Sequence, residues 1–205
     1  LAAILAAILA AILAAILAAI LAAILAAILA AILAAILAAT HPDLFAAVAP
    51  VAGCAYRTCG DPDGTAAFAA MGPRARVVPT LVVQGGADTV NNAAMGASAV
   101  GQWLATNDLA DDGRANGSVP LQPSSVTTHD AVLGTPPGDR CVGNSRLPCG
   151  GGVLGLASHP YTVARYDVDG RSVVEAVVIH GANHAITGGD PRGTFVDPAG
   201  PRWPS

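Results

Sequence analysis

Two polar residues follow strand-like segments at positions where their side chains could act together. Asp88 comes just after "PTLVVQGG", a continuous apolar run that is typical of a buried parallel strand. His184 lies in a glycine-rich loop after a later run, "VVEAVVIHG". In open α/β sheets, functional side chains gather beyond the carboxyl ends of the strands. An aspartate followed along the chain by a histidine fits the acid and the base of a triad in which a serine comes first.

The chemistry of such a triad explains why it needs these residue types. The carboxylate holds the imidazole in one tautomer, and the imidazole takes the proton of a serine hydroxyl that is otherwise a weak nucleophile. His180 ends the second strand-like run and is the rival candidate for the base. Ser98 follows Asp88 and lies within a helical pattern, so we expect a small helix residue rather than a nucleophile. Spacing alone leaves the pairing of Asp88 with His184 open.

The segments around these residues predict an α/β fold with a mostly parallel sheet flanked by helices. We expect a short buried strand within 45–53, a helix over 92–110, and two strands joined by an Asp-Gly turn within 161–181. Residues 111–160 are rich in turn formers and predict a long loop that contains two of the cysteines. Both candidate residues would then lie at one end of the sheet.

Residues 1–39 are a tandem LAAI repeat and predict a long low-complexity helix. Four residues overshoot one helical turn by about 40°, so the apolar stripe winds around this helix and offers no fixed face to a core. The repeat has no flanking Lys or Arg, no aromatic belt and no cleavage site, so it resembles neither a membrane anchor nor a signal peptide. We interpret it as filler or a repeat artefact, with a genuine membrane helix as the alternative.

The four cysteines form two local pairs. Cys54 and Cys59 close the loop "CAYRTC", and Cys141 and Cys149 close the loop "CVGNSRLPC". We favour a disulfide within each pair; four thiols permit three connectivities, and free buried thiols are the alternative. Paired cysteines in such loops indicate an oxidising, extracellular setting. We therefore expect a secreted protein whose signal peptide is not present in this sequence.

Composition argues against several classes of partner. The net charge is −4, there is no lysine, and the arginines are scattered, so nucleic acid is not an expected partner. No cluster of His, Cys and Asp has the spacing of metal ligands, so we expect no metal and no cofactor. Asp190 and Asp197 lie in "GGDPRGTFVDPAGP", where turn formation is the simpler interpretation and cation binding the alternative.

Longer motifs carry a family resemblance over nearly all of residues 40–205. The segments "PDLFAAVAPVAGCAYRTC", "VPTLVVQGGADTVNN", "QWLATNDLADDG" and "VIHGANHAITGGDPRGTFVDPAGP" resemble the secreted polyhydroxybutyrate depolymerase and feruloyl esterase family of α/β-hydrolases. The resemblance implies the C-terminal portion of an α/β-hydrolase that cleaves polyester, feruloyl or acetyl esters through an acyl-enzyme. It makes Asp88 the triad acid and His184 the base, and it places the long cysteine-containing loop near the substrate mouth.

The same resemblance implies that the nucleophilic serine is missing. The family carries a G-x-S-x-G-G turn before the helix that ends near Thr40, and the nucleophile position falls near Ile28 within the repeat. No serine precedes Ser98, and the donors of the oxyanion hole would be absent as well. We therefore expect a partial esterase domain over residues 40–205 that is inactive as this chain, because nucleophile, base and oxyanion hole act as a unit.

Two other interpretations stay open from the sequence. If the repeat is a true anchor and the cysteine loop a contact surface, the chain is a non-catalytic membrane-tethered or binding module. A metal-binding domain is the third interpretation, which the absence of ligand spacing disfavours. For the partial esterase, we expect an unpaired edge on the strand that ends at Val51, and poor solubility as its consequence.

Overall fold

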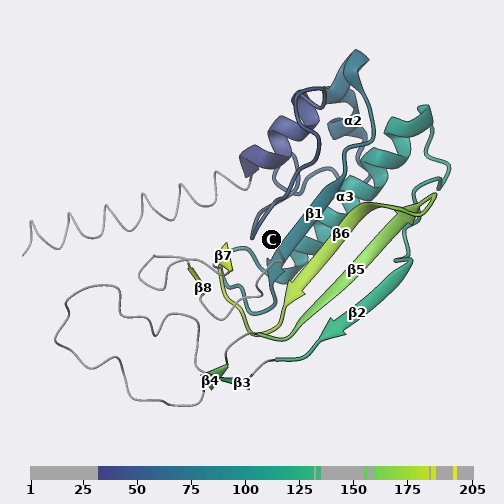
Figure 1. Ribbon diagram of the computed structural model, residues 1–205. Coiled ribbons are helices and arrows are strands. Elements are labelled where there is room, and N and C mark those ends of the chain that lie inside the picture. Colours follow the sequence, from purple (N-terminus) through teal and green to yellow (C-terminus); the bar gives the residue numbers. More distant parts are fainter. Residues whose placement is uncertain are drawn as a thin grey trace, which may run out of the picture.

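The computed structural model describes residues 32–131, 133–134, 155–156, 159–184, 186–187 and 196–197. These residues form a structure of the α/β class, in which helices pack on a mixed four-stranded sheet (Figure 1). The strands run in the order β1, β6, β5, β2 across the sheet. Their bounds are Thr80–Gly85 for β1, Ser125–His129 for β2, Tyr161–Val168 for β5 and Arg171–Ile179 for β6.

The sheet is less parallel than the sequence predicts. β1 and β6 pair in parallel, whereas β5 pairs antiparallel with both β6 and β2. The reason lies in the connection between β5 and β6, where Asp169 and Gly170 both have left-handed φ angles of 50° and 74°. A turn of two such residues joins only antiparallel strands. The predicted order of strand, Asp-Gly turn and strand is confirmed, and it is this hairpin that makes the sheet mixed.

β1 is the buried parallel strand predicted from "PTLVVQG", and all of its residues except Leu81 are buried. Beside it runs the segment 48–51, which forms two parallel bridges to β1 through Val48 and Val51. The strand predicted within 45–53 is therefore shorter and less regular than expected. Pro50 contributes to this, because it has no N–H to donate to a ladder.

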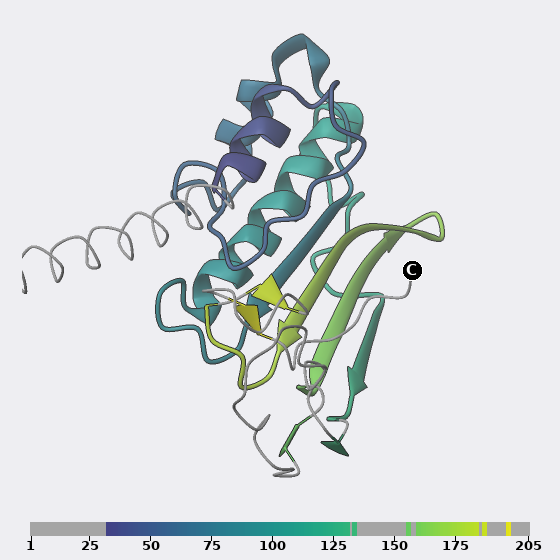
Figure 2. The same ribbon diagram turned by 60° about the vertical axis from the view of Figure 1, so that its left-hand side comes forward.

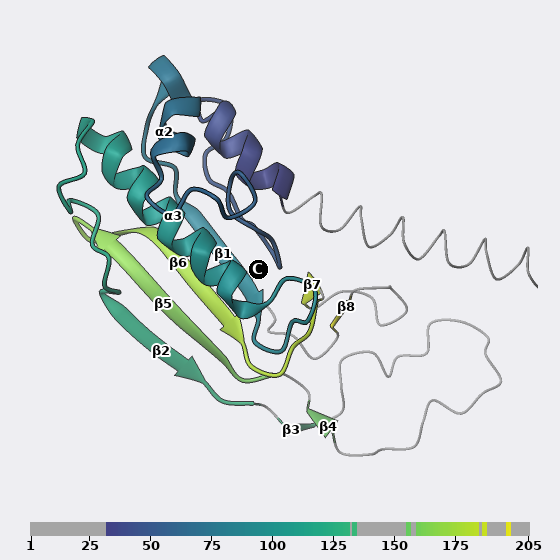
Figure 3. The same cartoon turned by 180° about the vertical axis from the view of Figure 1, so that it is seen from behind.

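The helices α2 (Thr65–Met71) and α3 (Ala93–Asp112) lie together on one side of the sheet (Figures 2 and 3). The chain makes a short 3-10 turn, η1 (Gly72–Arg74), after α2. α3 crosses β1 and β6 and buries Trp103 completely. The helix predicted over 92–110 is thus confirmed, and the side chain of Asn92 caps it by accepting a hydrogen bond from the Ala94 N–H at 3.1 Å.

Residues 32–40 are the described part of the predicted repeat helix (purple in Figure 1). Ala35, Ala38 and Ala39 are buried, and Ala38 belongs to the same apolar cluster as Trp103. The expectation that the repeat offers no fixed face to a core is therefore wrong for these last turns, where small side chains let the helix pack closely on the core. Within the described ranges, no helix combines the length and apolar character that crossing a membrane requires.

The region 111–160, predicted as a loop, contains β2 and the short strands β3 (Leu133–Gly134) and β4 (Gly155–Leu156). All five residues of β2 are exposed. The sequence signal of a strand is the alternation of apolar and polar residues that half-burial produces, and a strand exposed at every residue does not need it. β2 becomes a strand through pairing with β5. The short strands β7 (Ile186–Thr187) and β8 (Val196–Asp197) pair with each other.

The disulfide predicted between Cys54 and Cys59 is present. It ties the loop between the segment 48–51 and α2. The predicted pair Cys141 and Cys149 lies outside the described residues.

Candidate functional site

The structure brings Asp88 and His184 into direct contact. Asp88 lies in the loop after β1, and His184 lies in the loop after β6, the parallel neighbour of β1. The Nδ1 atom of His184 is 2.9 Å from Oδ2 of Asp88. The Asp88 side chain is fully buried and the His184 side chain is only 6% exposed. Two residues far apart in sequence therefore meet at the carboxyl ends of adjacent strands.

The surroundings of Asp88 fix its carboxylate in one orientation. Oδ1 accepts hydrogen bonds from the backbone N–H groups of Val90 and Asn91 at 2.8 and 2.9 Å. Oδ2 accepts from Nε2 of Gln84 at 3.1 Å as well as from His184. The two backbone N–H groups and the Gln84 amide donate, so both oxygens of the Asp88 carboxylate act as acceptors. Asp88 is thus held as an acceptor for the Nδ1 proton of the imidazole.

Gln84 and Asn91 position the loop after β1 that carries Asp88, which we call the aspartate loop. Gln84 belongs to β1, and its Nε2 also donates to the Asn91 carbonyl at 2.6 Å. The side chain of Asn91 in turn donates to the carbonyl of Ala52 at 2.6 Å. Ala52 follows the segment 48–51 and has a φ angle of 48°, which is unfavourable for a residue with a Cβ. The loop that carries Asp88 is therefore linked to two neighbouring chain segments.

The two loops that carry Asp88 and His184 approach each other closely. Asn183 links them, because its Oδ1 accepts from the N–H of Thr89 at 3.1 Å and from the N–H of His184 at 2.8 Å. Gly85 makes this approach sterically allowed. A Cβ at Gly85 would come within 2.5 Å of the Asn183 carbonyl oxygen and 2.6 Å of the Ala182 carbonyl oxygen. The glycine at the end of β1 thus lets the loops meet.

The rival base His180 is placed differently. It is exposed, and its Nε2 lies 2.8 Å from Oγ1 of Thr162 on β5. His129 stacks on Tyr161 with ring centroids 4.4 Å apart, and His41 bonds to the neighbouring Thr40. His184 is thus the histidine that contacts Asp88.

The predicted nucleophile position near Ile28 lies outside the described residues. Ser98 lies within α3, as the sequence predicts, and not on a strand-to-helix turn. Asp190 lies outside the described residues, and of Asp197 only the backbone in β8 is described. In the part of the chain that the structure describes, no group of three or more His, Cys, Asp or Glu side chains could hold a metal ion.

Sequence reasoning missed the roles of Gln84, Asn91 and Asn183. For Gln84 a signal was present, because a polar residue inside the continuous apolar run of β1 must find partners when it is buried. For Asn91 and Asn183 the sequence offers no comparable signal, since asparagine is common in loops. Their bonds reach Ala52 and Thr89, which are distant in the sequence.

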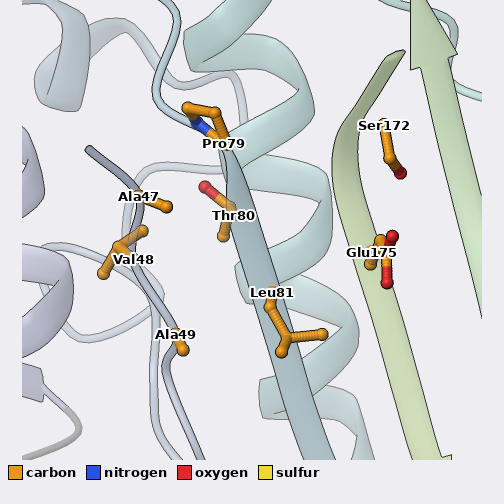
Figure 4. Close-up of a pocket in the computed structure, with 8 residues that line it drawn as sticks. All are labelled: Ala47, Val48, Ala49, Pro79, Thr80, Leu81, Ser172 and Glu175. Carbon is orange, nitrogen blue, oxygen red and sulfur yellow. The ribbon is translucent and has the colours of Figure 1, made fainter. Parts of the chain in front are cut away.

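A hollow of about 400 Å³ lies on the sheet face opposite α3 (Figure 4). Pro79 and Thr80 line it at the amino end of β1, with Leu81 and Glu175 facing each other across β1 and β6. Asp88 follows the other end of β1. This hollow is therefore separate from the Asp88–His184 pair.

Comparison with known proteins finds no protein-family model that matches the chain, and no curated protein matches it either. The function is therefore inferred from the geometry of the Asp88–His184 pair.

Proposed function

We propose that this chain carries the acid and base of a serine esterase of the α/β-hydrolase type, related to polyhydroxybutyrate depolymerases and feruloyl esterases. The observation that carries the proposal is the 2.9 Å contact between His184 Nδ1 and the buried carboxylate of Asp88. An oriented carboxylate on one nitrogen of an imidazole is the arrangement that prepares the other nitrogen to act as a base. The parallel pairing of β1 with β6 adds support, because the loops that carry Asp88 and His184 then follow the carboxyl ends of neighbouring strands at the same end of the sheet.

In the proposed reaction, Asp88 keeps the Nδ1 proton on His184, so that Nε2 of the neutral ring is an acceptor. Nε2 takes the proton of the serine hydroxyl that attacks the ester and gives it to the departing alcohol. Asp88 stays ionised throughout and stabilises the imidazolium that forms between these steps.

The substrate class and location belong to the same proposal. The expected substrate is a carboxylic ester, either a polyester or a feruloyl or acetyl ester, and no cofactor takes part. The Cys54–Cys59 disulfide supports secretion, because disulfides persist in oxidising compartments.

Without a serine near position 28, we expect the chain to hydrolyse an activated aryl ester no faster than the His184→Ala variant does. Base and nucleophile act as a unit, so the pair alone contributes little. The test is fluorophosphonate labelling of the purified 205-residue chain, read by intact mass and by mapping of any modified residue. We expect no adduct. An adduct at one serine that disappears in His184→Ala would mean that the chain contains a working nucleophile, and the account of the repeat would be wrong.

A further inference from the structure

The side-chain amide of Gln84 is held in one orientation inside the fold. Gln84 belongs to β1 and is only 3% exposed. Its Nε2 lies 3.1 Å from Oδ2 of Asp88, 2.6 Å from the Asn91 carbonyl oxygen and 3.4 Å from the Gly85 carbonyl oxygen. Carbonyl oxygens can only accept hydrogen bonds, so the NH₂ end of the amide must face this group of atoms. The surrounding backbone therefore makes Gln84 a donor to Asp88.

This orientation leaves the other end of the amide without a partner. Oε1 of Gln84 is buried and accepts no hydrogen bond within the described structure. It is packed against α3, where a Cβ added to Gly96 would lie 3.0 Å from it. An unsatisfied buried acceptor lowers stability, so an apolar side chain would fill this place without that cost. A role in packing alone does not explain a glutamine here.

Gln102 on α3 is a buried glutamine of the opposite kind. Its Oε1 accepts from the Tyr56 N–H at 2.7 Å, and its Nε2 donates to the Tyr56 carbonyl at 3.1 Å and to Oδ2 of Asp61 at 2.8 Å. Both ends of this amide are satisfied, and its partners lie in the chain before α2. Gln84 is satisfied at one end only, and that end faces Asp88.

We propose that Gln84 is a positioning residue that acts through Asp88 on the proton of His184. Nε2 of Gln84 and Nδ1 of His184 both lie within hydrogen-bond distance of the same oxygen, Oδ2 of Asp88. An oxygen that already accepts from Gln84 is oriented as an acceptor, and this favours the form of the ring in which Nδ1 donates. The other ring nitrogen is then unprotonated, as a base requires. The inference rests on the proposed function for this last step alone, because the position of the proton can be measured without catalysis.

Two matched variants of the 205-residue chain test the proposal. Gln84→Met and Gln102→Met each replace a buried glutamine by an unbranched apolar side chain, and the ring ¹⁵N shifts of neutral His184 report its tautomer. We expect Gln84→Met to lower the ratio of the Nδ1–H form to the Nε2–H form roughly 3- to 10-fold, which is the effect of one net hydrogen bond. Gln102→Met should leave this ratio unchanged and should lower the urea midpoint more, because both ends of its amide lose partners. An unchanged ratio in Gln84→Met, or an equal fall in both variants, would overturn the proposal.

The wild-type chain supplies a second measurement that needs no folded variant. Two protons donated to one oxygen lie close together, so we expect a nuclear Overhauser effect between the Nδ1 proton of His184 and the side-chain amide of Gln84. If His184 is protonated at Nδ1 and this effect is absent, the role of Gln84 is overturned and the Asp88–His184 pair stands. If the proton is on Nε2 instead, the pair itself is contradicted, and the proposed function is overturned together with this inference.

Discussion

At the scale of single residues, Asp88 is the best-supported part of the candidate site. Four donors surround its carboxylate, and one of them is the imidazole of His184. The consequence for His184 is chemical, because the position of its proton is decided by the acceptor at Nδ1. Gly85 has an equally specific role, which is to leave space for the carbonyl groups of the histidine loop.

We expect neutral His184 to carry its proton on Nδ1 in the wild-type chain. In Asp88→Ala this preference should disappear, because the acceptor is gone. The ring ¹⁵N chemical shifts measure which nitrogen is protonated. Thr162→Ala removes the partner of His180 instead and should leave the His184 shifts unchanged. Wild-type shifts typical of an Nε2–H tautomer would contradict the Asp88–His184 contact.

The glycines offer a comparison between a crowded and an open position. Gly85→Ala places a Cβ against two carbonyl oxygens, so we expect the free energy of unfolding to fall by about 1–3 kcal/mol. Gly101→Ala lies in the interior of α3 with nothing within 4 Å, and it should raise that free energy by about 0.5–1 kcal/mol. Denaturant midpoints of the two variants measure both effects. Similar midpoints would show that the loops do not meet at Gly85.

At the scale of elements, α3 organises both the core and the site. Its first turn packs Gly96 onto Gln84, and its middle buries Trp103. Near its carboxyl end, Asp108 holds the following loop by accepting hydrogen bonds from the N–H groups of Gly117 and Val119. One helix therefore connects the aspartate loop, the core and the chain that leads to β2.

The Asp108 carboxyl gives a pH dependence with a defined sign. Burial alone would raise its pKa, but the hydrogen bonds from Val119, Gly117 and Ser118 hold the pKa below its ordinary value. A folded-state pKa below the unfolded value of about 3.9 contributes stability that is fully present above pH 3.9. This contribution is lost as the pH falls through the lower, folded-state pKa.

Asp108→Asn should therefore lower the free energy of unfolding at pH 7 by about 1–3 kcal/mol, since hydrogen bonds to a charged group are lost. The difference from wild type should begin to shrink as the pH falls below about 3.9 and should be lost as the pH passes through the lower, folded-state pKa, because protonation then removes the charge of the wild-type carboxyl as well. Urea unfolding at a series of pH values measures this. Asp130→Asn, at an exposed carboxyl, is the matched control. A difference that stays constant with pH would contradict the assigned role.

At the scale of the whole molecule, no strand among the described residues pairs with the outer side of the segment 48–51. The backbone groups through which Val48, Pro50 and Ala52 form hydrogen bonds point toward the neighbouring chain at residues 79–83. The N–H and C=O groups of Ala49 and Val51 consequently face away from β1, and Ala49 is exposed. The hollow beside Ala49 in Figure 4 adds apolar surface next to this edge that the described residues leave open. An open edge with such surface is a template for association between chains.

We expect the purified chain to self-associate, and Ala49→Lys to reduce this association, because a lysine on an edge strand opposes pairing with another strand. Ala94→Lys adds the same charge to exposed α3 and should have a smaller effect. Sedimentation velocity at several concentrations compares the two variants. Equal association of both would show that the edge is not the site of contact.

The sequence by itself determined the elements whose signals are local. The apolar β-branched run predicted β1, the Asp-Gly turn predicted the hairpin of β5 and β6, and helical spacing predicted α3. Asp88 and His184 could be singled out as candidates because each follows a strand-like run in the sequence. Each of these signals depends on residues that are close together in the chain.

Only the tertiary structure decided how these elements combine. β6 lies between β1 and β5, which makes the sheet mixed, and exposed β2 is a strand only because β5 pairs with it. The contacts of Gln84 with Asp88 and of Asn91 with Ala52 likewise arise from packing. Burial obliges polar groups to find partners wherever the folded chain brings them, and sequence distance does not reveal which partners those are.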